Sequence, residues 1–353
     1  MGIHTMGMFI LRRTGVMLLT ALCLTFIVFI LTTLYPNLEK LAKNQGNFRM
    51  SDAEVASYLG NRGYTQGKLQ NYGEWLGVLP GYVIDGVDGK TRGRCSNHGV
   101  VEPDTPKFCG VLQGNWGFSS VFKEPVSDVV KTRLALTGKL MFWVMIVMIP
   151  GALIIGVFAG MREGSRLDRS LSTGAIVTTA TPEYVSGVIF IAIFTSSAVG
   201  LKWFKGSATS AMDNATLENF LLPVLTIALY GMGYVARMTR ASMTEVMTAQ
   251  YIRTARLKGV SFANIVLKHA LRNALIAPFT VIMLQIPWLL NGVVIVETLF
   301  NFKGFGWVLV QAASNNDIDL LLAVAVVGVI VVLLTQLISD IGYVFLNPRI
   351  RIS

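Results

Sequence analysis

Long apolar runs separated by polar segments are the main pattern of this chain. Six runs reach the roughly 20 residues that a helix needs to cross a bilayer. These runs cover residues 14–35, 137–161, 170–199, 219–240, 274–298 and 320–344. Hydrocarbon offers the backbone no hydrogen-bond partners, and the runs lack the alternation of a membrane barrel, so each run is expected to be helical. The pattern predicts an all-α polytopic membrane protein with six transmembrane helices.

One long polar segment, residues 36–131, separates the first run from the second. Within it, Ser51-Asp-Ala-Glu54 has the spacing of a capping box and predicts a short helix that ends at Gly60. Residues 78–110 are richer in Gly and Asp, which favours a loop or a hairpin insertion. We expect three parts: an N-terminal anchor helix (1–35), an extracytoplasmic segment (36–131) and a five-helix core (132–353).

The segment 248–265 differs from an ordinary loop between spans because it is basic and amphipathic. Ile252 and Ala255 lie three residues apart, as on one face of a helix, and Gly259 then interrupts the pattern. Apolar residues at helical spacing resume at Phe262. Two short helices near 250–270 with a bend between them can lie along the membrane face and dock a soluble partner. The candidate docking residues are Tyr251, Arg253, Thr254, Ala255, Arg256, Leu257, Lys258 and Gly259.

Composition supports the membrane class, and charge gives the orientation. Hydrophobic residues make up 53% of the chain and charged residues 14%, which excludes an ordinary soluble globule. If the N-terminus is cytoplasmic, fourteen Lys and Arg fall in inner segments and three in short outer loops, as the enrichment of cytoplasmic loops in these residues requires. We therefore expect a bacterial inner-membrane protein with both termini in the cytoplasm. Orientation also accounts for the net charge of +10, so no nucleic-acid partner is expected.

The chain has three cysteines. Cys23 lies inside the first run, where it is an ordinary small apolar residue. Cys95 and Cys109 share the segment expected to face an oxidising compartment, so a disulfide between them is predicted. Closing a loop of that size is worth roughly 3 kcal/mol in the chain-entropy description. The alternative is two unpaired thiols in a poorly ordered loop.

A catalytic centre is hard to build from these residues. His4, His98 and His269 fall in three separate regions and no Cys-x-x-Cys occurs, so no metal site or cofactor is expected. Gly89-Lys-Thr91 resembles the end of a phosphate-binding loop, but Ile84 stands where that loop requires Gly. The chain is therefore not expected to be an enzyme or to hydrolyse ATP itself.

Polar residues within the apolar runs are candidates for a translocation path because they are costly in lipid. Glu183 and Tyr184 lie about halfway along the third run, directly after Pro182. Two interpretations stay open: they line a polar path, or Glu183 packs against a polar group of a neighbouring helix. Gln285 and Asn291 of the fifth run are further candidates, although hydrogen bonding between helices is the commoner use of such residues.

Two further acidic residues lie near the ends of runs. Glu297 is expected to reach water or Lys303 at the outer end of the fifth run. Asp340, at the inner end of the sixth run, is expected to pair with a basic group such as Arg349 rather than to move protons.

The docking segment reads Arg253-Thr-Ala-Arg-Leu-Lys-Gly259, followed by His269-Ala-Leu-Arg-Asn-Ala-Leu275. It resembles the Glu-Ala-Ala-x-x-x-Gly signature of permease subunits of binding-protein-dependent ABC importers, and in particular the dipeptide/oligopeptide/nickel branch. Ala255 and Gly259 match the signature, whereas Arg253 and Thr254 depart from it. Other stretches similar to that branch are Phe9-Ile-Leu-Arg-Arg13, Gly114-Asn-Trp-Gly-Phe-Ser119, Val294-Ile-Val-Glu-Thr298, Gly304-Phe-Gly306, Asp340-Ile-Gly-Tyr343 and Asn347-Pro-Arg-Ile350.

The resemblance covers nearly the whole chain except about 78–110. It implies one half of a heterodimeric pore whose partners are a second homologous permease, two cytoplasmic ATPases and an external substrate-binding protein. The expected function is that of a permease subunit in an ATP-driven importer of peptides or peptide-like solutes. One alternative is a proton-coupled secondary transporter with Glu183 as the proton carrier. A second alternative is a membrane anchor or assembly factor without transport activity.

Overall fold

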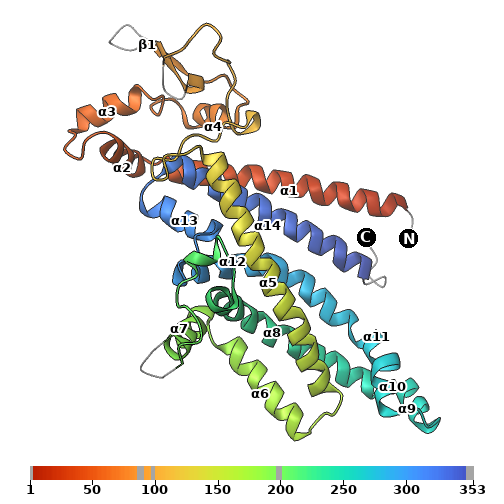
Figure 1. Ribbon diagram of the computed structural model, residues 1–353. Coiled ribbons are helices and arrows are strands. Elements are labelled where there is room, and N and C mark those ends of the chain that lie inside the picture. The colour runs from red at the N-terminus through yellow and green to blue at the C-terminus, as the bar shows by residue number, and fades with distance from the viewer. Residues whose placement is uncertain (1–2, 86–90, 97–99, 196–200, 347–353) are drawn as a thin grey trace. The chain divides into compact units, whose positions relative to one another are not determined.

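The computed structural model describes residues 3–85, 91–96, 100–195 and 201–346 (Figure 1). Helices dominate it, which confirms the predicted all-α membrane class. Among the described residues, four helical stretches are continuous, long and apolar enough to cross a bilayer by themselves. They are Ile10–Thr32 within α1 (Ile3–Thr32), α5 (Val126–Gly160), α8 (Leu217–Met247) and Ile318–Gly342 within α14 (Ile318–Leu346).

The two remaining apolar runs are bent. The run predicted over 170–199 is not one continuous helix within the described residues, because α6 (Arg166–Ala180) and α7 (Glu183–Phe194) meet at an angle of 106°. Pro182 directly precedes α7 and cannot donate a backbone hydrogen bond, so the break falls where the chain can start a new helix. A milder bend of 49° precedes α12 (Ile276–Leu299). The structure thus has four spans, or up to six if each bent pair crosses the membrane.

The chain divides into two compact units. The first, here called the core unit, comprises residues 1–16, 135–307 and 331–353. The second, here called the segment unit, comprises residues 17–134 and 308–330. The segment unit thus joins most of the polar segment to parts of α1 and α14 that are far away in the sequence.

Helix α8 is the centre of the core unit, where it packs against α6, α7 and α12. The buried cluster combines residues such as Leu140 and Met148 of α5, Ile227 of α8 and Leu289 of α12. Small residues permit the close approach of α8 to α6, since a Cβ at Gly233 would overlap with Thr178. A single predominantly buried helix therefore connects the other spans of this unit.

The segment unit contains short helices and one two-stranded sheet. Its helices are α2 (Tyr35–Gln45), α3 (Asp52–Gly60) and α4 (Lys68–Leu76), and β1 (Val83–Asp85) pairs antiparallel with β2 (Thr91–Gly93). The predicted capping box is confirmed: Ser51 Oγ accepts from the Glu54 N–H, Glu54 accepts from the Ser51 N–H, and α3 ends at Gly60. The hairpin expected within 78–110 is present as β1 and β2.

An aromatic cluster forms the core of the segment unit. Phe29 of α1 packs against Tyr72 and Trp75 of α4, with ring centroids 5.4 and 5.8 Å apart. Ile318 and Leu322 of α14 belong to the same buried cluster. The cluster therefore packs the short helices α2, α3 and α4 against α1 and α14.

Polar contacts reinforce this attachment. Asp317, which is buried, accepts from Ser119 Oγ at 2.7 Å and from the Val121 N–H at 3.1 Å. Asn316 donates to the carbonyl of Asn37 at 2.7 Å. The short apolar run before α14 is helix α13 (Phe305–Ser314).

Asp340 does pair with a basic group, but the partner is Arg13 of α1, at 2.6 Å. Arg349, suggested as the partner from the sequence, belongs to the motif Asn347-Pro-Arg-Ile350 outside the described residues. Arg13 lies in the segment that precedes the first apolar run, so this ion pair connects the beginning of the chain to α14.

Cys95 and Cys109 have the geometry of a disulfide, with Cα atoms 5.3 Å apart and a separation of 14 positions in the sequence. Cys109 is buried, and a Cβ at Gly81 would lie 2.8 Å from Cys95 Sγ. The disulfide therefore lies directly against the backbone at Gly81, beside the β-hairpin.

We expect mass spectrometry of protein digested without reductant to recover a peptide linked through Cys95 and Cys109. The Cys95→Ser variant should lose about 3 kcal/mol of stability in this region, because the loop is no longer closed in the unfolded chain. Its polar segment should then be cut faster by a protease than that of the wild type. Cys23 serves as the internal control for an unpaired thiol. Free thiols at both Cys95 and Cys109 in oxidised protein would contradict the bond.

Candidate functional site

The predicted docking segment forms a short amphipathic helix directly after α8 (Figure 1). This helix, α9 (Gln250–Leu257), buries Ile252 and Ala255, the two residues that the sequence places on its apolar face. They pack in a cluster with Met243 and Met247 from the end of α8. The buried face of α9 is therefore fixed to the helix that forms the centre of the core unit.

The other face of α9 is exposed and basic. Among the predicted docking residues, the exposed ones are Tyr251, Arg253, Thr254, Arg256, Leu257, Lys258 and Gly259. The side chain of Leu257 is 82% exposed, the highest value among the large hydrophobic residues that the structure describes as exposed. Leu257 thus presents a large apolar surface between Arg256 and Lys258, on the face of α9 that does not pack against α8.

A tight turn at Gly259 ends α9. The Val260 N–H donates to the Ala255 carbonyl at 3.2 Å and the Gly259 N–H to the Arg256 carbonyl at 3.0 Å, which is the pattern of a Schellman cap. Gly259 has φ +74°, a conformation that favours glycine. No atom lies within 4 Å of the position that a Cβ would take. The turn therefore needs glycine for its backbone and not for lack of space.

A second short helical stretch follows the turn, as the sequence predicts. It consists of α10 (Phe262–Asn264), a π-helical turn (Ile265–Ala270) and α11 (Leu271–Ala274). The Asn273 amide donates to the Tyr251 hydroxyl at 2.9 Å and thereby ties this stretch to α9. Ser242 of α8 donates to the Ala274 carbonyl at 2.8 Å. We call residues 250–274 the docking hairpin.

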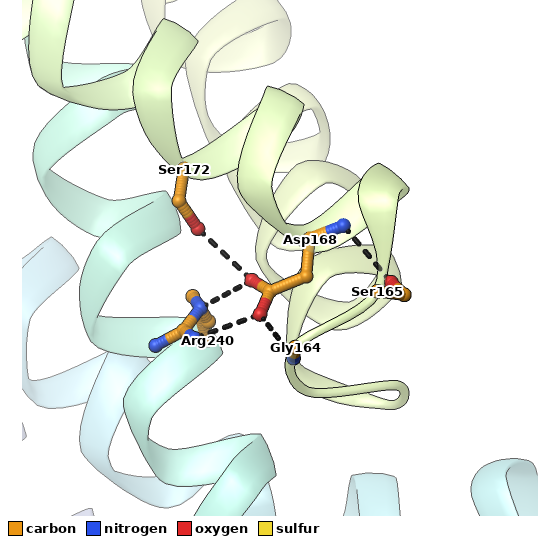
Figure 2. A network of polar contacts seen from close by, with 5 residues as sticks. All are labelled: Gly164, Ser165, Asp168, Ser172 and Arg240. Carbon is orange, nitrogen blue, oxygen red and sulfur yellow. Dashed lines mark hydrogen bonds and ion pairs between the residues drawn. The ribbon is translucent and has the colours of Figure 1, made fainter.

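Asp168 of α6 and Arg240 of α8 form a bidentate ion pair close to the end of α8 (Figure 2). Arg240 Nε donates to Oδ1 at 2.5 Å and its terminal nitrogen to Oδ2 at 2.8 Å. The Gly164 N–H and the Ser172 hydroxyl also donate to this carboxylate, at 2.8 and 3.0 Å. Asp168 is only 2% exposed, and its own N–H is capped by Ser165 Oγ at 3.1 Å. The pair fastens α6 to α8 seven positions before α8 ends at Met247.

No pattern in the sequence marks Asp168 as a functional residue. The Ser165-x-x-Asp168 spacing signals a helix start, which the structure has, but it does not reveal the partner. Arg240 lies 72 residues further along the chain, and only the packing of α6 on α8 brings the two together.

Glu183 lies at the first position of α7, not midway along a continuous helix. A carboxylate there is favoured by the partial positive charge of a helix start. Its Oε1 lies 3.0 Å from the position of a Cβ at Gly292 of α12, so the carboxylate approaches that helix closely. Gly292 has no polar side chain, so this approach is not the polar pair that the packing interpretation requires.

The other path candidates are dispersed over two helices. Tyr184 of α7 is 51% exposed, whereas Gln285 of α12 is buried. The side chain of Asn291 lies outside the part of the chain that the structure describes. The described residues thus do not by themselves bring the four candidates to one surface.

Glu297 does not reach water or Lys303 as predicted, because it is fully buried. It accepts hydrogen bonds from the Thr137 hydroxyl of α5 and from the Trp307 N–H, the latter at 3.0 Å. A Cβ at Gly304 would overlap with the same carboxylate, so glycine is required there for space. Donors from two distant segments compensate for the burial of this acid.

Comparison with known proteins identifies the family. Residues 152–352 match the family described as "Binding-protein-dependent transport system inner membrane component". The chain is 34% identical to the "Probable peptide ABC transporter permease protein y4tP" of Sinorhizobium fredii, with 68% of this chain and 77% of the relative covered. With the "Oligopeptide transport system permease protein AppB" of Bacillus subtilis the identity is 32%, with the same coverage. With the "Glutathione transport system permease protein GsiC" of Salmonella typhimurium it is 34%, over 68% and 76%.

The chain belongs to this family. It is therefore a multi-pass permease component of an ABC transport system that works with a substrate-binding protein. Members of the family are not enzymes, and ATP hydrolysis takes place in separate subunits, as the sequence predicts. The matched residues include the docking hairpin, the Asp168–Arg240 pair and Glu297.

Replacing Asp168 by alanine removes the acceptor of Arg240, Gly164 and Ser172. We expect this change to lower the free energy of unfolding by about 2–3 kcal/mol, because partly buried charged and polar groups lose their partner. The measurement is the melting temperature of the purified chain in detergent. In the Asp168→Ala/Arg240→Ala double variant the loss should be clearly smaller than the sum of the two single losses.

Glu245→Ala, which removes an exposed carboxylate from the same helix as Arg240, is the control and should leave the melting temperature unchanged. Strictly additive losses for the two single variants would show that the pair does not act as a unit.

Proposed function

We propose that this permease component forms half of the translocation path of an ATP-driven importer of peptides or peptide-like solutes. The observation that carries the proposal is the docking hairpin, a basic and exposed α9 whose buried face is fixed to α8 and which ends in a tight turn at Gly259. The solute class is taken from the relatives, which are named as permeases for peptides, oligopeptides and glutathione. A second homologous permease would supply the other half of the path.

The orientation follows from charge. With both termini in the cytoplasm, the docking hairpin faces the compartment that contains ATP, and segment 36–131 faces outward. The geometry of Cys95 and Cys109 agrees with this orientation, because disulfides persist in oxidising compartments outside the cytoplasm.

Two cytoplasmic ATPases are proposed to act on the hairpin, one on this chain and one on its homologous partner. A push on α9 reaches α8 through the shared cluster around Ile252, and it reaches α6 through the Asp168–Arg240 pair. Movement of packed helices as rigid bodies then opens the path to one side or the other. An external binding protein would deliver the solute to the outward-open state.

The proton-coupled alternative finds no support. The family consists of binding-protein-dependent systems, and Glu183 sits at a helix start against α12. We propose instead that the break between α6 and α7 exposes Glu183 and Tyr184 to the path, with Gln285 and Asn291 as further lining residues from α12. Irregular backbone is tolerated at membrane depth where it borders a cavity or is buried in protein.

The Gly259→Val variant should uncouple ATP hydrolysis from solute uptake, because valine strongly disfavours the φ of +74° that the turn requires. We expect solute uptake by proteoliposomes to fall at least tenfold. The variant should still insert into the membrane, and the ATPases should still hydrolyse ATP. The matched control is Gly259→Asn, which adds a side chain to the same open space but tolerates this conformation. Equal uptake by both variants would contradict the role of the turn.

Replacing the exposed Leu257 by serine should weaken attachment of the ATPase. Burial of a leucine against a partner is worth about 1.5–3 kcal/mol, so the affinity for the ATPase should fall by about tenfold or more and less ATPase should copurify with the variant. Leu112→Ser is the control, since Leu112 is 70% exposed but lies in the segment between α1 and α5. A similar yield of ATPase from both variants would exclude Leu257 from the contact.

A further inference from the structure

The segment unit contains a cavity of about 900 Å³, which is within the range of small-molecule sites. Its wall comes from α1, α2, the connection between α3 and α4, α4 itself, the residues flanking the β-hairpin, the loop before α5 and the start of α14. All of these lining residues belong to the segment unit, so the cavity does not depend on how the two units are placed. The family match begins at residue 152 and leaves most of this wall outside.

Two arginines, Arg62 and Arg94, contribute to the wall of the cavity. The Arg62 guanidinium is already held by Gln45 at 2.6 Å and lies over the Tyr58 ring at 4.3 Å. Arg94 has no hydrogen-bond acceptor or ion-pair partner for its guanidinium among the residues that the structure describes. An unpaired arginine in a cavity wall is suited to a carboxylate, which it can bind with two parallel hydrogen bonds.

A negative group faces the same cavity. Asp319, in the first turn of α14, lines the wall and interacts electrostatically with Arg94 and Arg62 without forming an ion pair with either. A Cβ at Gly117 would lie 2.6 Å from its Oδ2, so the carboxylate approaches the backbone of the loop before α5 closely. The neighbouring Asp317 differs, since Ser119 and backbone N–H groups already satisfy it. Glu74 also lines the cavity and interacts electrostatically with Arg94, but its two carboxylate oxygens already accept from Gln70 and from the Tyr82 N–H. Asp319 is thus the acid of this wall that retains capacity for a cationic group.

Neutral donors and aromatic surfaces complete the wall. Tyr64 and Tyr82 line the cavity, and burial raises the pKa of Tyr82 to about 12 and raises the pKa of Tyr64 as well. Both hydroxyls therefore stay protonated at neutral pH and can form hydrogen bonds with a ligand. Trp75 and Phe118 add flat apolar surface for a side chain.

We propose that this cavity binds a short peptide with free termini, its carboxylate on Arg94 and its ammonium group on Asp319. Opposite charges in one wall select a zwitterion over a simple anion or cation, and the aromatic side chains accommodate an apolar residue. The choice of a peptide among zwitterions rests on the proposed function. The site itself belongs to the segment unit and requires neither ATP nor another subunit.

The test is isothermal titration calorimetry with the full-length chain in lipid nanodiscs. Three probes are compared: alanyl-phenylalanine, its N-acetyl form and its C-terminal amide. The wild type should bind the free dipeptide saturably and each blocked form about tenfold or more weakly, because each loses a charge-assisted hydrogen bond. The Asp319→Asn variant should bind the free dipeptide and its N-acetyl form with equal affinity. The Arg94→Gln variant should bind the free dipeptide and its C-terminal amide with equal affinity.

Arg49→Gln is the control, because Arg49 is an exposed arginine of the same unit outside the cavity wall. It should behave as the wild type with all three probes. No saturable binding by a monodisperse wild-type chain, or equal affinity for the three probes, overturns the proposal even if a variant fails to fold. The proposal is also overturned if Asp319→Asn and Arg94→Gln still bind the blocked forms as much more weakly than the free dipeptide as the wild type does. A negative result leaves the proposed transport function intact, since uptake is measured separately.

Discussion

The backbone of a membrane-embedded chain must satisfy its own hydrogen bonds, and the architecture follows from this constraint. Long helices meet it in α1, α5, α8 and α14, while turns and breaks are confined to positions where other groups compensate. On the exposed docking hairpin, the Schellman cap at Gly259 satisfies two carbonyls at the end of α9. At the break before α7, Pro182 has no N–H to satisfy, and Glu183 provides a negative charge at the new helix start.

The functional account depends on one continuous mechanical connection. Helix α8 runs through the centre of the core unit, bears Arg240 near its end and leads within three residues into α9. Because α9 is packed against the end of α8 and α6 is fastened to α8, a displacement of the hairpin acts on several spans together. The buried Glu297 plays a comparable structural role at α12, where it joins α5 to the segment that begins at Gly304.

Local features were predictable from the sequence, whereas tertiary contacts were not. Apolar spacing at Ile252 and Ala255, the glycine of the turn and the capping box at Ser51 depend on neighbours within a few residues, and all three are observed. The 106° bend could not be derived, since Pro182 indicates a break but not its angle. The burial of Glu297 was not predictable either, because Thr137, which donates a hydrogen bond to its carboxylate, lies 160 positions away in the sequence. The wall of the cavity in the segment unit combines stretches that lie between residues 29 and 123 with residues 314–322, and no local pattern connects them.

The central claim is that the docking hairpin lies on the cytoplasmic face beneath an ATPase. The most direct measurement is the labelling of an Arg256→Cys variant, in a Cys23→Ser background, by a membrane-impermeant maleimide. The account predicts labelling in inside-out vesicles stripped of the ATPase, none in right-side-out vesicles, and protection when the ATPase is added back. Labelling from the outer side, or labelling that the ATPase leaves unchanged, would contradict it.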